Sequence, residues 1–221
     1  SKKIMEDLIM SYSEIFKVTT ARFANVAFSN GSLLAGYINR IQKKQPLSCP
    51  NDIKRFFVSP EESGQICLLS CILGESGQIF YPKLDKSNLI SFRNITEDFA
   101  FFINKKIKIF KREYDAKKYS QENFSSEELI VYFFNSDTTG EKPYEEFFSN
   151  DDNIDEKKFR GLGIIHNSLK NSNKKVISFI SKIQNSLEKN NVDKNKIVKL
   201  FKDYITDFNH FEKGKNLDQK M

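Results

Sequence analysis

The sequence predicts an α/β fold, because helical and extended segments alternate along residues 1–134. The first helix is expected over residues 3–16, where apolar side chains recur at helical spacing. Residues 17–23 combine β-branched side chains with an aromatic one and are expected to form a strand. The 221 residues are 39% hydrophobic and include 21 Phe, which is enough apolar material to bury a core and excludes a wholly disordered chain.

Local start and stop signals place the next elements. A turn over residues 29–32 precedes apolar side chains at helical spacing over 33–41, which indicates a second helix. Pro46 and Pro50 bracket a segment that is expected to be a loop. That loop leads into a short apolar strand over residues 55–58.

The helix expected after residue 58 has the clearest start. Ser59 is placed to cap it, Pro60 takes its first helical position, and Glu62 stands where a capping box needs an acidic residue. Gly74 and Gly77 are expected to end it. Its buried face is expected to consist of Ile66, Leu69, Ile72 and Leu73.

The same patterns assign the remaining elements. Residues 129–134 are a continuous apolar run and predict a buried strand, whereas the polar residues 113–127 predict a loop or a weak helix. A loop is expected over residues 137–142. Further strands are expected over 78–81, 107–110 and 162–165, and helices over 95–103, 150–158, 176–187 and 197–208.

The net charge of +6 is concentrated in the tail. Residues 170–221 hold 12 Lys, no Arg and 6 Asp or Glu, so the rest of the chain is neutral. Without Arg, the tail lacks the forked donor that binds phosphate and guanine, and a solvated helical face is favoured over a nucleic-acid site. We therefore expect two parts, an α/β portion over residues 1–169 and a Lys-rich helical tail over 170–221, with no nucleic-acid partner.

Cysteine usage and hydropathy point to the cytoplasm. The three cysteines are too few, and odd in number, for a disulfide framework, which favours a reducing compartment. Cys67 and Cys71 lie four residues apart on one apolar helix face and are expected to fill the core. No apolar run of about 18 residues predicts a membrane span, and the start of the chain does not have the pattern of a signal peptide.

Residue spacing alone does not complete an active site. His166 and His210 stand alone and no Cys-x-x-Cys occurs, so no metal site is expected. The sequence contains neither a Gly-x-Ser-x-Gly elbow nor a Gly-rich phosphate loop. Any further functional assignment rests on similarity to a known family.

Five short segments of the chain resemble segments of a known family, and they follow one another in the same order and at similar spacing. They are residues 1–7 (SKKIMED) at a helix start, 22–26 (RFANV) at a strand end, 31–33 (GSL) at a helix start, 52–62 (DIKRFFVSPEE), and 140–146 (GEKPYEE) in a loop. The chain resembles the nucleotide-sugar 4,6-dehydratases of bacterial polysaccharide and nonulosonate biosynthesis, such as UDP-N-acetylglucosamine 4,6-dehydratases, in the extended short-chain dehydrogenase/reductase superfamily. The last residues, 214–221, resemble a legionaminic-acid-type branch.

The resemblance implies that the chain is the C-terminal portion of such an enzyme. The family builds its NAD(P) site on a Rossmann-like N-terminal half with a Gly-rich turn, and no such turn is present here. The family's Tyr-x-x-x-Lys pair, or Met-x-x-x-Lys, would place its first member before Ser1. The resemblance therefore implies NADP or NAD as cofactor, a homo-oligomeric full-length enzyme, and a chain that is inactive alone.

The resemblance also implies roles for three residues in the first part of the chain. Lys2 would be a catalytic and cofactor-binding residue that hydrogen-bonds the nicotinamide ribose; the alternative is a solvated Lys at a helix start. Asn25 would bond the sugar or diphosphate, or else be an ordinary turn residue. Ser32, at a helix N-terminus, would help to bind an anion, or else be a plain N-cap.

Three further substrate-binding residues follow from the same resemblance. Arg55 beside two Phe residues would bind the diphosphate with its guanidinium fork, the alternative being a salt bridge to Glu61 or Glu62. Glu141 and Lys142 would lie in the loop that closes over the nucleotide. Many relatives carry Arg-Pro just before this Gly-Glu-Lys motif, where this chain has Thr-Thr, so the choice between UDP and GDP stays open.

The implied reaction is a 4,6-dehydration of a nucleotide-linked N-acetylhexosamine. A bound nicotinamide takes hydride from C4, water leaves across C5–C6, and hydride returns to C6. A nucleotide-sugar epimerase of the same fold is the alternative, and its product keeps the mass of the substrate. A non-catalytic basic module that binds nucleic acid through the tail is the alternative from another class, and its affinity would fall steeply with salt.

Overall fold

The computed structural model of the chain describes residues 1–123, 127–136, 146–166, 171–188, 192–205, 208 and 210. The chain divides into two compact units. Unit 1 comprises Ser1–Arg22, Gln65–Lys83 and Phe147–Phe211, and unit 2 comprises Phe23–Gly64, Leu84–Glu146 and Glu212–Met221. These two units are defined by the contacts within the chain. The division at residue 169, into a substrate-binding portion and a helical tail, stays a prediction.

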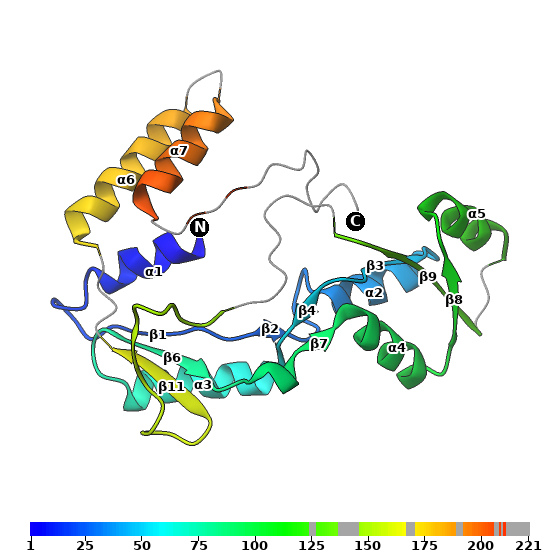
Figure 1. Cartoon of the computed structure of the whole chain (residues 1–221), viewed down its shortest axis with the longest axis horizontal. Coiled ribbons are helices and arrows are strands. Elements are labelled where there is room, and N and C mark those ends of the chain that lie inside the picture. Colours follow the sequence, from blue (N-terminus) through cyan, green and yellow to red (C-terminus); the bar gives the residue numbers. More distant parts are fainter. Residues whose placement is uncertain are drawn as a thin grey trace. The chain divides into compact units, whose positions relative to one another are not determined.

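Unit 1 is built around a four-stranded sheet in the order β1–β6–β11–β10, of which Figure 1 labels β1, β6 and β11. β1 (Thr19–Ala21) and β6 (Gln78–Pro82) run parallel, whereas β11 (Leu162–His166) is antiparallel to β6 and β10 (Asn153–Asp155) is antiparallel to β11. The helices that contribute to unit 1 are α1 (Lys2–Met10), α3 (Pro60–Leu73, from Gln65 onward), α6 (Asn173–Leu187) and α7 (Lys194–Tyr204).

Alternate residues of β6 face opposite sides of the sheet, as the period of two along a strand requires. Ile79 and Tyr81 pack with Met10 of α1 on one side. Phe80 packs with Ile66 of α3 on the other side. The sheet of unit 1 is therefore covered by a helix on each face, which is the layered arrangement of an α/β fold.

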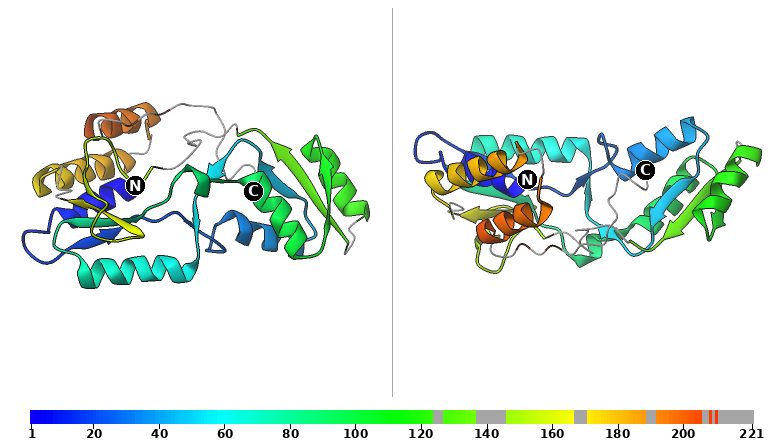
Figure 2. Two further views of the ribbon diagram at one scale, coloured as in Figure 1. Left: turned by 60° about the horizontal axis from the view of Figure 1, so that its bottom comes forward. Right: turned by 90° about the horizontal axis from the view of Figure 1, so that it is seen from above.

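The two C-terminal helices pack on the first helix. α6 and α7 lie side by side, and α1 lies beside α6 (Figures 1 and 2). Val176, Phe179 and Tyr204 form the buried centre of this cluster, and Ile4 and Leu8 of α1 pack against it. Residues at the two ends of the described chain thus share one apolar cluster.

A buried carboxylate fixes this packing. Asp7 is 4% exposed and accepts hydrogen bonds from the Tyr204 hydroxyl at 3.0 Å and from Asn171 Nδ2 at 3.1 Å. Lys3 Nζ lies 2.8 Å from the other carboxylate oxygen. Burial and the hydrogen bond to Asp7 raise the pKa of Tyr204, so its phenol stays protonated and continues to donate.

Unit 2 contains a parallel sheet of three strands in the order β3–β9–β8. Leu47, Cys49 and Val131 from this sheet pack with Tyr37 and Phe99 from the helices in one core. The elements of unit 2 are β2 (Asn25–Val26), α2 (Leu33–Gln42), β3 (Leu47–Pro50), β4 (Lys54–Arg55), β5 (Phe57–Val58), the 3-10 helix η1 (Lys86–Asn88), β7 (Ile90–Ser91), α4 (Phe92–Phe102), β8 (Lys106–Phe110), α5 (Glu113–Asn123) and β9 (Glu128–Phe134).

Several expectations from the sequence are confirmed. The mixed α/β alternation is present, and residues 129–134 lie in strand β9, of which Leu129, Ile130 and Val131 are buried and the rest are half-buried. The capping box at the start of α3 is formed: the Glu62 N–H donates to Ser59 Oγ at 3.1 Å, and the Ser59 N–H donates to Glu62 Oε2 at 2.7 Å. Within the described part of the chain, no helix has the length and apolar character needed to cross a bilayer.

Other element boundaries differ from the expectation. The first helix ends at Met10 and not at residue 16, because turns follow it. The segment expected as a loop around Pro46 and Pro50 contains strand β3, which pairs with β9 far along the chain. The segment expected as a helix over 150–158 instead contributes strand β10, paired with β11. In each case a non-local pairing or a chain reversal outweighed the local pattern.

The expected buried face of α3 is largely wrong. Leu69, Ile72 and Leu73 are 39%, 63% and 44% exposed. Cys67 and Cys71, expected in the core, are exposed as well. The helix buries Ile66 and Ser70 toward the sheet and leaves most of its apolar surface uncovered.

The Asp7 network predicts a stability effect. Replacing Asp7 by Ala removes the acceptor of the Tyr204 hydroxyl and of the Asn171 amide, and it removes one of the two carboxylates that Lys3 contacts. The free energy of unfolding therefore falls by about 3 kcal/mol. Tyr204→Phe removes one hydrogen bond and lowers it by only about 1 kcal/mol. Urea unfolding of the two variants measures the difference, and equal losses for both would contradict a central role for the carboxylate.

Candidate functional site

Lys2 lies at the exposed start of α1. Ser1 precedes the helix as its N-cap residue, without a side-chain capping bond. Lys2 is exposed, and no hydrogen bond or ion pair of its ammonium group occurs within the described residues. Its charge is therefore available to a ligand, although exposure alone is equally consistent with the solvated Lys that the sequence left as the alternative.

A bidentate ion pair holds α1 onto the end of β1. Arg22 Nε donates to Glu6 Oε2 at 2.8 Å, and Arg22 Nη2 donates to Glu6 Oε1 at 2.6 Å. Arg22 Nη1 also donates to the Phe147 carbonyl at 2.6 Å and lies 4.0 Å from Asp152 Oδ2. The pair thus fixes the helix that begins with Lys2 against the strand that leads out of unit 1.

The electrostatics of this pair follow from its geometry. Burial opposes ionisation of Glu6, but the hydrogen bonds and charge of Arg22, together with Lys3, outweigh it and hold the pKa of Glu6 below its ordinary value. Burial likewise opposes the charge of Arg22, but Glu6 outweighs it and leaves the pKa of Arg22 above its ordinary value. Both groups are therefore ionised across the neutral pH range.

Asn25 carries a buried donor that no residue of the described ranges satisfies. Its backbone N–H donates to the Phe56 carbonyl at 3.1 Å, and β2 pairs in parallel with β5 so that Asn25 lies opposite Phe57. The side-chain Nδ2 is buried and has no hydrogen-bond partner in the described part of the chain. Such an orphan donor costs free energy unless a ligand or water satisfies it, so it marks a place where an acceptor can bind.

Arg55 lies in the same unit and close to Asn25 along the sheet pairings. It is 9% exposed, its Nη1 donates to the Lys54 carbonyl at 2.9 Å, and its Cζ lies 5.8 Å from the centroid of the Phe92 ring. The backbone of Asn25 bonds to Phe56, the residue after Arg55. The sequence left a salt bridge to Glu61 or Glu62 as the alternative role of Arg55. Of these two, Glu62 closes the capping box with Ser59.

Ser32 caps α2 as an ordinary N-cap. Its side-chain oxygen accepts from the Ala35 N–H at 3.3 Å. Two turns connect it to β2, with the Ser29 N–H bonded to the Val26 carbonyl and the Ser32 N–H bonded to the Ser29 carbonyl. The capping role is therefore present, and an additional role in binding an anion stays a prediction.

The predicted site residues divide between the units. Asn25, Ser32 and Arg55 all belong to unit 2, whereas Lys2 belongs to unit 1. Glu141 and Lys142, like Thr138 and Thr139, lie outside the described residues.

Sequence reasoning did not assign Glu6 and Arg22 to the site. Both lie inside the segments that carry the family resemblance, residues 1–7 and 22–26. Arg22 directly follows a partly buried strand, where a charged side chain needs a carboxylate partner, and that was the signal that could have found this pair. The pair positions α1, because Glu6 and Arg22 bond each other and Arg22 also bonds the Phe147 carbonyl.

Comparison with known proteins identifies the family. Residues 1–167 match the family described as polysaccharide biosynthesis protein, and the chain belongs to that family. Among solved structures it is similar to Pen from Bacillus thuringiensis, with 23% sequence identity and a TM-score of 0.55. The match covers 78% of this chain and 48% of the Pen chain, so this chain spans about half of the protein it resembles. No curated protein matches the chain.

The Glu6–Arg22 pair predicts an acid-side loss of stability. A carboxylate whose pKa is lowered by folding stabilises the protein above its unfolded pKa, and that contribution is lost as pH falls through its folded pKa. From about pH 5 to about pH 3, the free energy of unfolding should therefore fall more steeply for the wild type than for Glu6→Gln.

Urea unfolding at a series of pH values measures this slope. Glu97→Gln is the matched control, because it removes an exposed carboxylate paired with Arg93 at 3.0 Å, and it should keep the wild-type slope. Parallel curves for the wild type and Glu6→Gln would show that the pair does not stabilise the fold.

Proposed function

We propose that this chain is the substrate-binding portion of a nucleotide-sugar 4,6-dehydratase of the extended short-chain dehydrogenase/reductase superfamily. Its place in a polysaccharide biosynthesis family and its α/β fold support this proposal. The observation that carries it is the buried Nδ2 donor of Asn25, which has no hydrogen-bond partner among the described residues and lies in the unit that also buries Arg55. The substrate class is a UDP- or GDP-linked N-acetylhexosamine.

The chemistry of the two side chains suits a diphosphate. A guanidinium binds phosphate oxygens through parallel N–H donors, and such charge-assisted bonds are stronger than neutral ones. The half-buried setting of Asn25 and the burial of Arg55 reduce competition from water. In this proposal Arg55 binds the diphosphate and the Asn25 amide donates to a neighbouring oxygen of the diphosphate or sugar. Ser32, Glu141 and Lys142 complete the substrate contacts.

The cofactor, NADP or NAD, contacts this chain through Lys2. A nicotinamide supplies the acceptor and donor of hydride when it is bound. The exposed Lys2 ammonium fits this role as a donor to a ribose hydroxyl and as a nearby positive charge. Glu6 and Arg22 position the helix from which Lys2 projects.

A substitution of Arg55 tests the proposal by measuring how tightly this chain binds a nucleotide sugar. Arg55→Gln removes the guanidinium fork but keeps a polar side chain, so it should weaken UDP-N-acetylglucosamine binding by at least about tenfold. Isothermal titration calorimetry measures the dissociation constant, with thermal unfolding as a check that the variant is folded.

Arg93→Gln is the matched control in the same unit. Arg93 is an exposed arginine that bonds Glu97 and lies over the Phe133 ring, and its loss should leave the affinity unchanged. If Arg55→Gln and Arg93→Gln bind the nucleotide sugar equally well, Arg55 does not bind the diphosphate.

A further inference from the structure

Phe28 has a backbone conformation that is unusual for its residue type. Its φ is +60°, in the left-handed region, which is unfavourable for a residue with a Cβ and rare for a bulky one. Asn30 and Gly31, which are residue types that tolerate this region, follow in the same loop. The chain therefore places an aromatic residue where Gly or Asn would stand with less strain.

The turn after β2 imposes this conformation on Phe28. The Ser29 N–H donates to the Val26 carbonyl at 3.3 Å, and Ser29 Oγ donates to the same carbonyl at 2.8 Å. These bonds close a four-residue turn in which Phe28 is the third residue. Turns with a positive φ at that position normally carry Gly or Asn there. The strain is therefore fixed by hydrogen bonds of the neighbouring residues.

Burial of the ring offsets little of this strain. The Phe28 side chain is 53% exposed, and it contacts no other aromatic ring within the described ranges. Phe99, a core aromatic of the same unit, is 8% exposed and packs on the Tyr37 ring. A strained residue that the core does not need is typical of a functional position.

Phe28 lies at the carboxyl end of a parallel strand pair. β2 and β5 run parallel, with Val26 opposite Val58. The Ala27 N–H then bonds to the Val58 carbonyl, and Phe28 follows directly after it. In α/β proteins, ligands bind outside the carboxyl ends of parallel strands. The exposed ring therefore stands at an edge where a ligand is expected.

The residues on either side of Phe28 are those proposed to bind the nucleotide sugar. Asn25, whose Nδ2 no described residue satisfies, precedes it in β2. Ser32, the N-cap of α2, follows it after the turn. The Asn25 N–H also bonds to the carbonyl of Phe56, the residue next to Arg55. An exposed aromatic side chain thus lies between two of the proposed ligand contacts along the chain.

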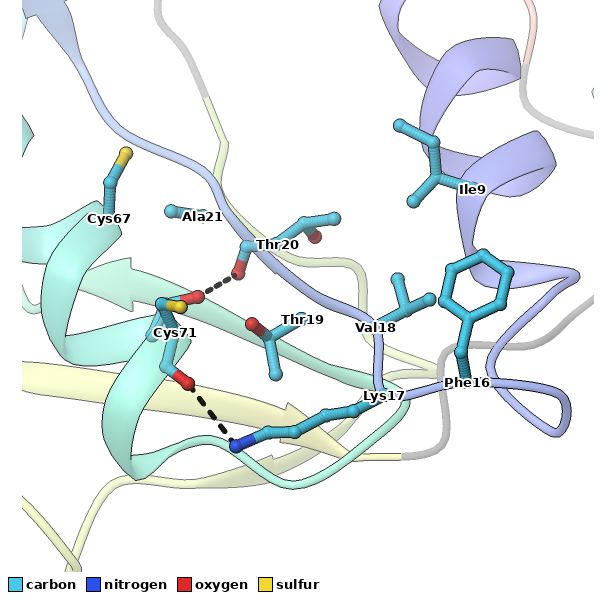
Figure 3. Close-up of a pocket in the computed structure, with 10 residues that line it drawn as sticks. Ile9, Phe16, Lys17, Val18, Thr19, Thr20, Ala21, Cys67 and Cys71 are labelled. Atoms are coloured by element: carbon cyan, nitrogen blue, oxygen red, sulfur yellow. Dashed lines mark hydrogen bonds between the residues drawn. The ribbon is translucent and has the colours of Figure 1, made fainter.

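The pocket in unit 1 is less suited to a nucleotide. It has a volume of about 390 Å³ and lies along β1 (Figure 3). Lys17 Nζ donates to the Cys71 carbonyl at 3.2 Å, and Ser70 Oγ donates to the Thr20 carbonyl at 3.3 Å. The cation and this hydroxyl of the pocket are therefore already engaged and do not offer their donors to a diphosphate.

We propose that the Phe28 ring stacks on the nucleobase of the bound nucleotide sugar. This inference rests on the proposed function, because it assigns the base to the same site in which Arg55 binds the diphosphate. Every nucleobase has a flat π-face, so an aromatic side chain can bind uracil or guanine without reading its hydrogen-bonding groups. The strained turn keeps the ring out of the core, where a base can reach it.

A pair of ligands with and without a base tests the stacking. UDP carries the base, and N-acetylglucosamine 1-phosphate does not; both are titrated into the complete ¹⁵N-labelled chain, and amide shifts give the dissociation constants. Phe28→Ala should weaken UDP binding by about tenfold and leave the affinity for the sugar phosphate unchanged. Equal UDP affinity of Phe28→Ala and the wild type would overturn the proposal, and so would an equal loss for both ligands.

Three further variants separate the ring from the backbone. Phe28→Tyr keeps the aromatic face and should bind UDP within about twofold of the wild type. Phe28→Gly relieves the positive φ, so it should raise the midpoint of thermal unfolding while it still weakens UDP binding. Phe101→Ala is the matched control, because it removes an 87% exposed Phe of the same unit, and it should leave UDP affinity unchanged. A loss in Phe28→Tyr as large as that in Phe28→Ala would show that the ring does not stack.

The results distinguish this inference from the proposed function. If Arg55→Gln weakens nucleotide-sugar binding and Phe28→Ala does not, only the stacking is rejected. If Phe28→Ala weakens UDP binding while Arg55→Gln and Arg93→Gln bind the nucleotide sugar equally well, only the assignment of Arg55 to the diphosphate is rejected.

Discussion

The bidentate ion pair between Glu6 and Arg22 is the constraint on which unit 1 depends. It joins the first helix to the end of the first strand, and it lies beside Asp7, which joins the same helix to α7 and to the segment before α6. Because α1 is held from both sides, the position of its first residues, including Lys2, is set by the contacts of the buried Asp7 and of the partly buried Glu6 and Arg22, and not by helix propensity alone. Glu6 and Arg22 therefore position the start of α1 without being exposed cations or anions themselves, since their charged groups bond each other.

Each of the two units leaves backbone or side-chain groups that no described residue pairs with. Unit 2 buries an amide donor at Asn25 that no described residue satisfies, which fits a small polar ligand. Unit 1 ends its sheet at β1, which pairs with β6 and has no described strand on its other side.

Elements that are determined by neighbouring residues could be predicted from the sequence. Elements that depend on pairing with a distant segment could not. The start of α3 was predictable because Ser59 and Glu62 cap the helix within a single turn. Helical spacing showed which residues of α3 share a face, but not whether a neighbour covers that face, so Leu69 and Ile72 were wrongly expected to be buried. Strands β3 and β10 depend on partners elsewhere in the chain, and no local pattern encodes those pairings.

The same limit applies to the site. Resemblance selected Asn25 and Arg55, and the structure places both in unit 2. It did not select Glu6 and Arg22, because a positioning role appears only when the two segments meet in space. The unsatisfied state of the Asn25 amide is likewise a property of burial, which sequence spacing does not report.

The side-chain amide of Asn25 tests the central claim most directly. Its ¹⁵N–H signals, assigned with an Asn25→Asp variant, can be followed while UDP-N-acetylglucosamine is added to the labelled chain. The proposal predicts a saturable shift of these signals, because an orphan donor gains an acceptor. Unchanged Asn25 signals at a concentration that saturates binding elsewhere, or no binding at all, would contradict it.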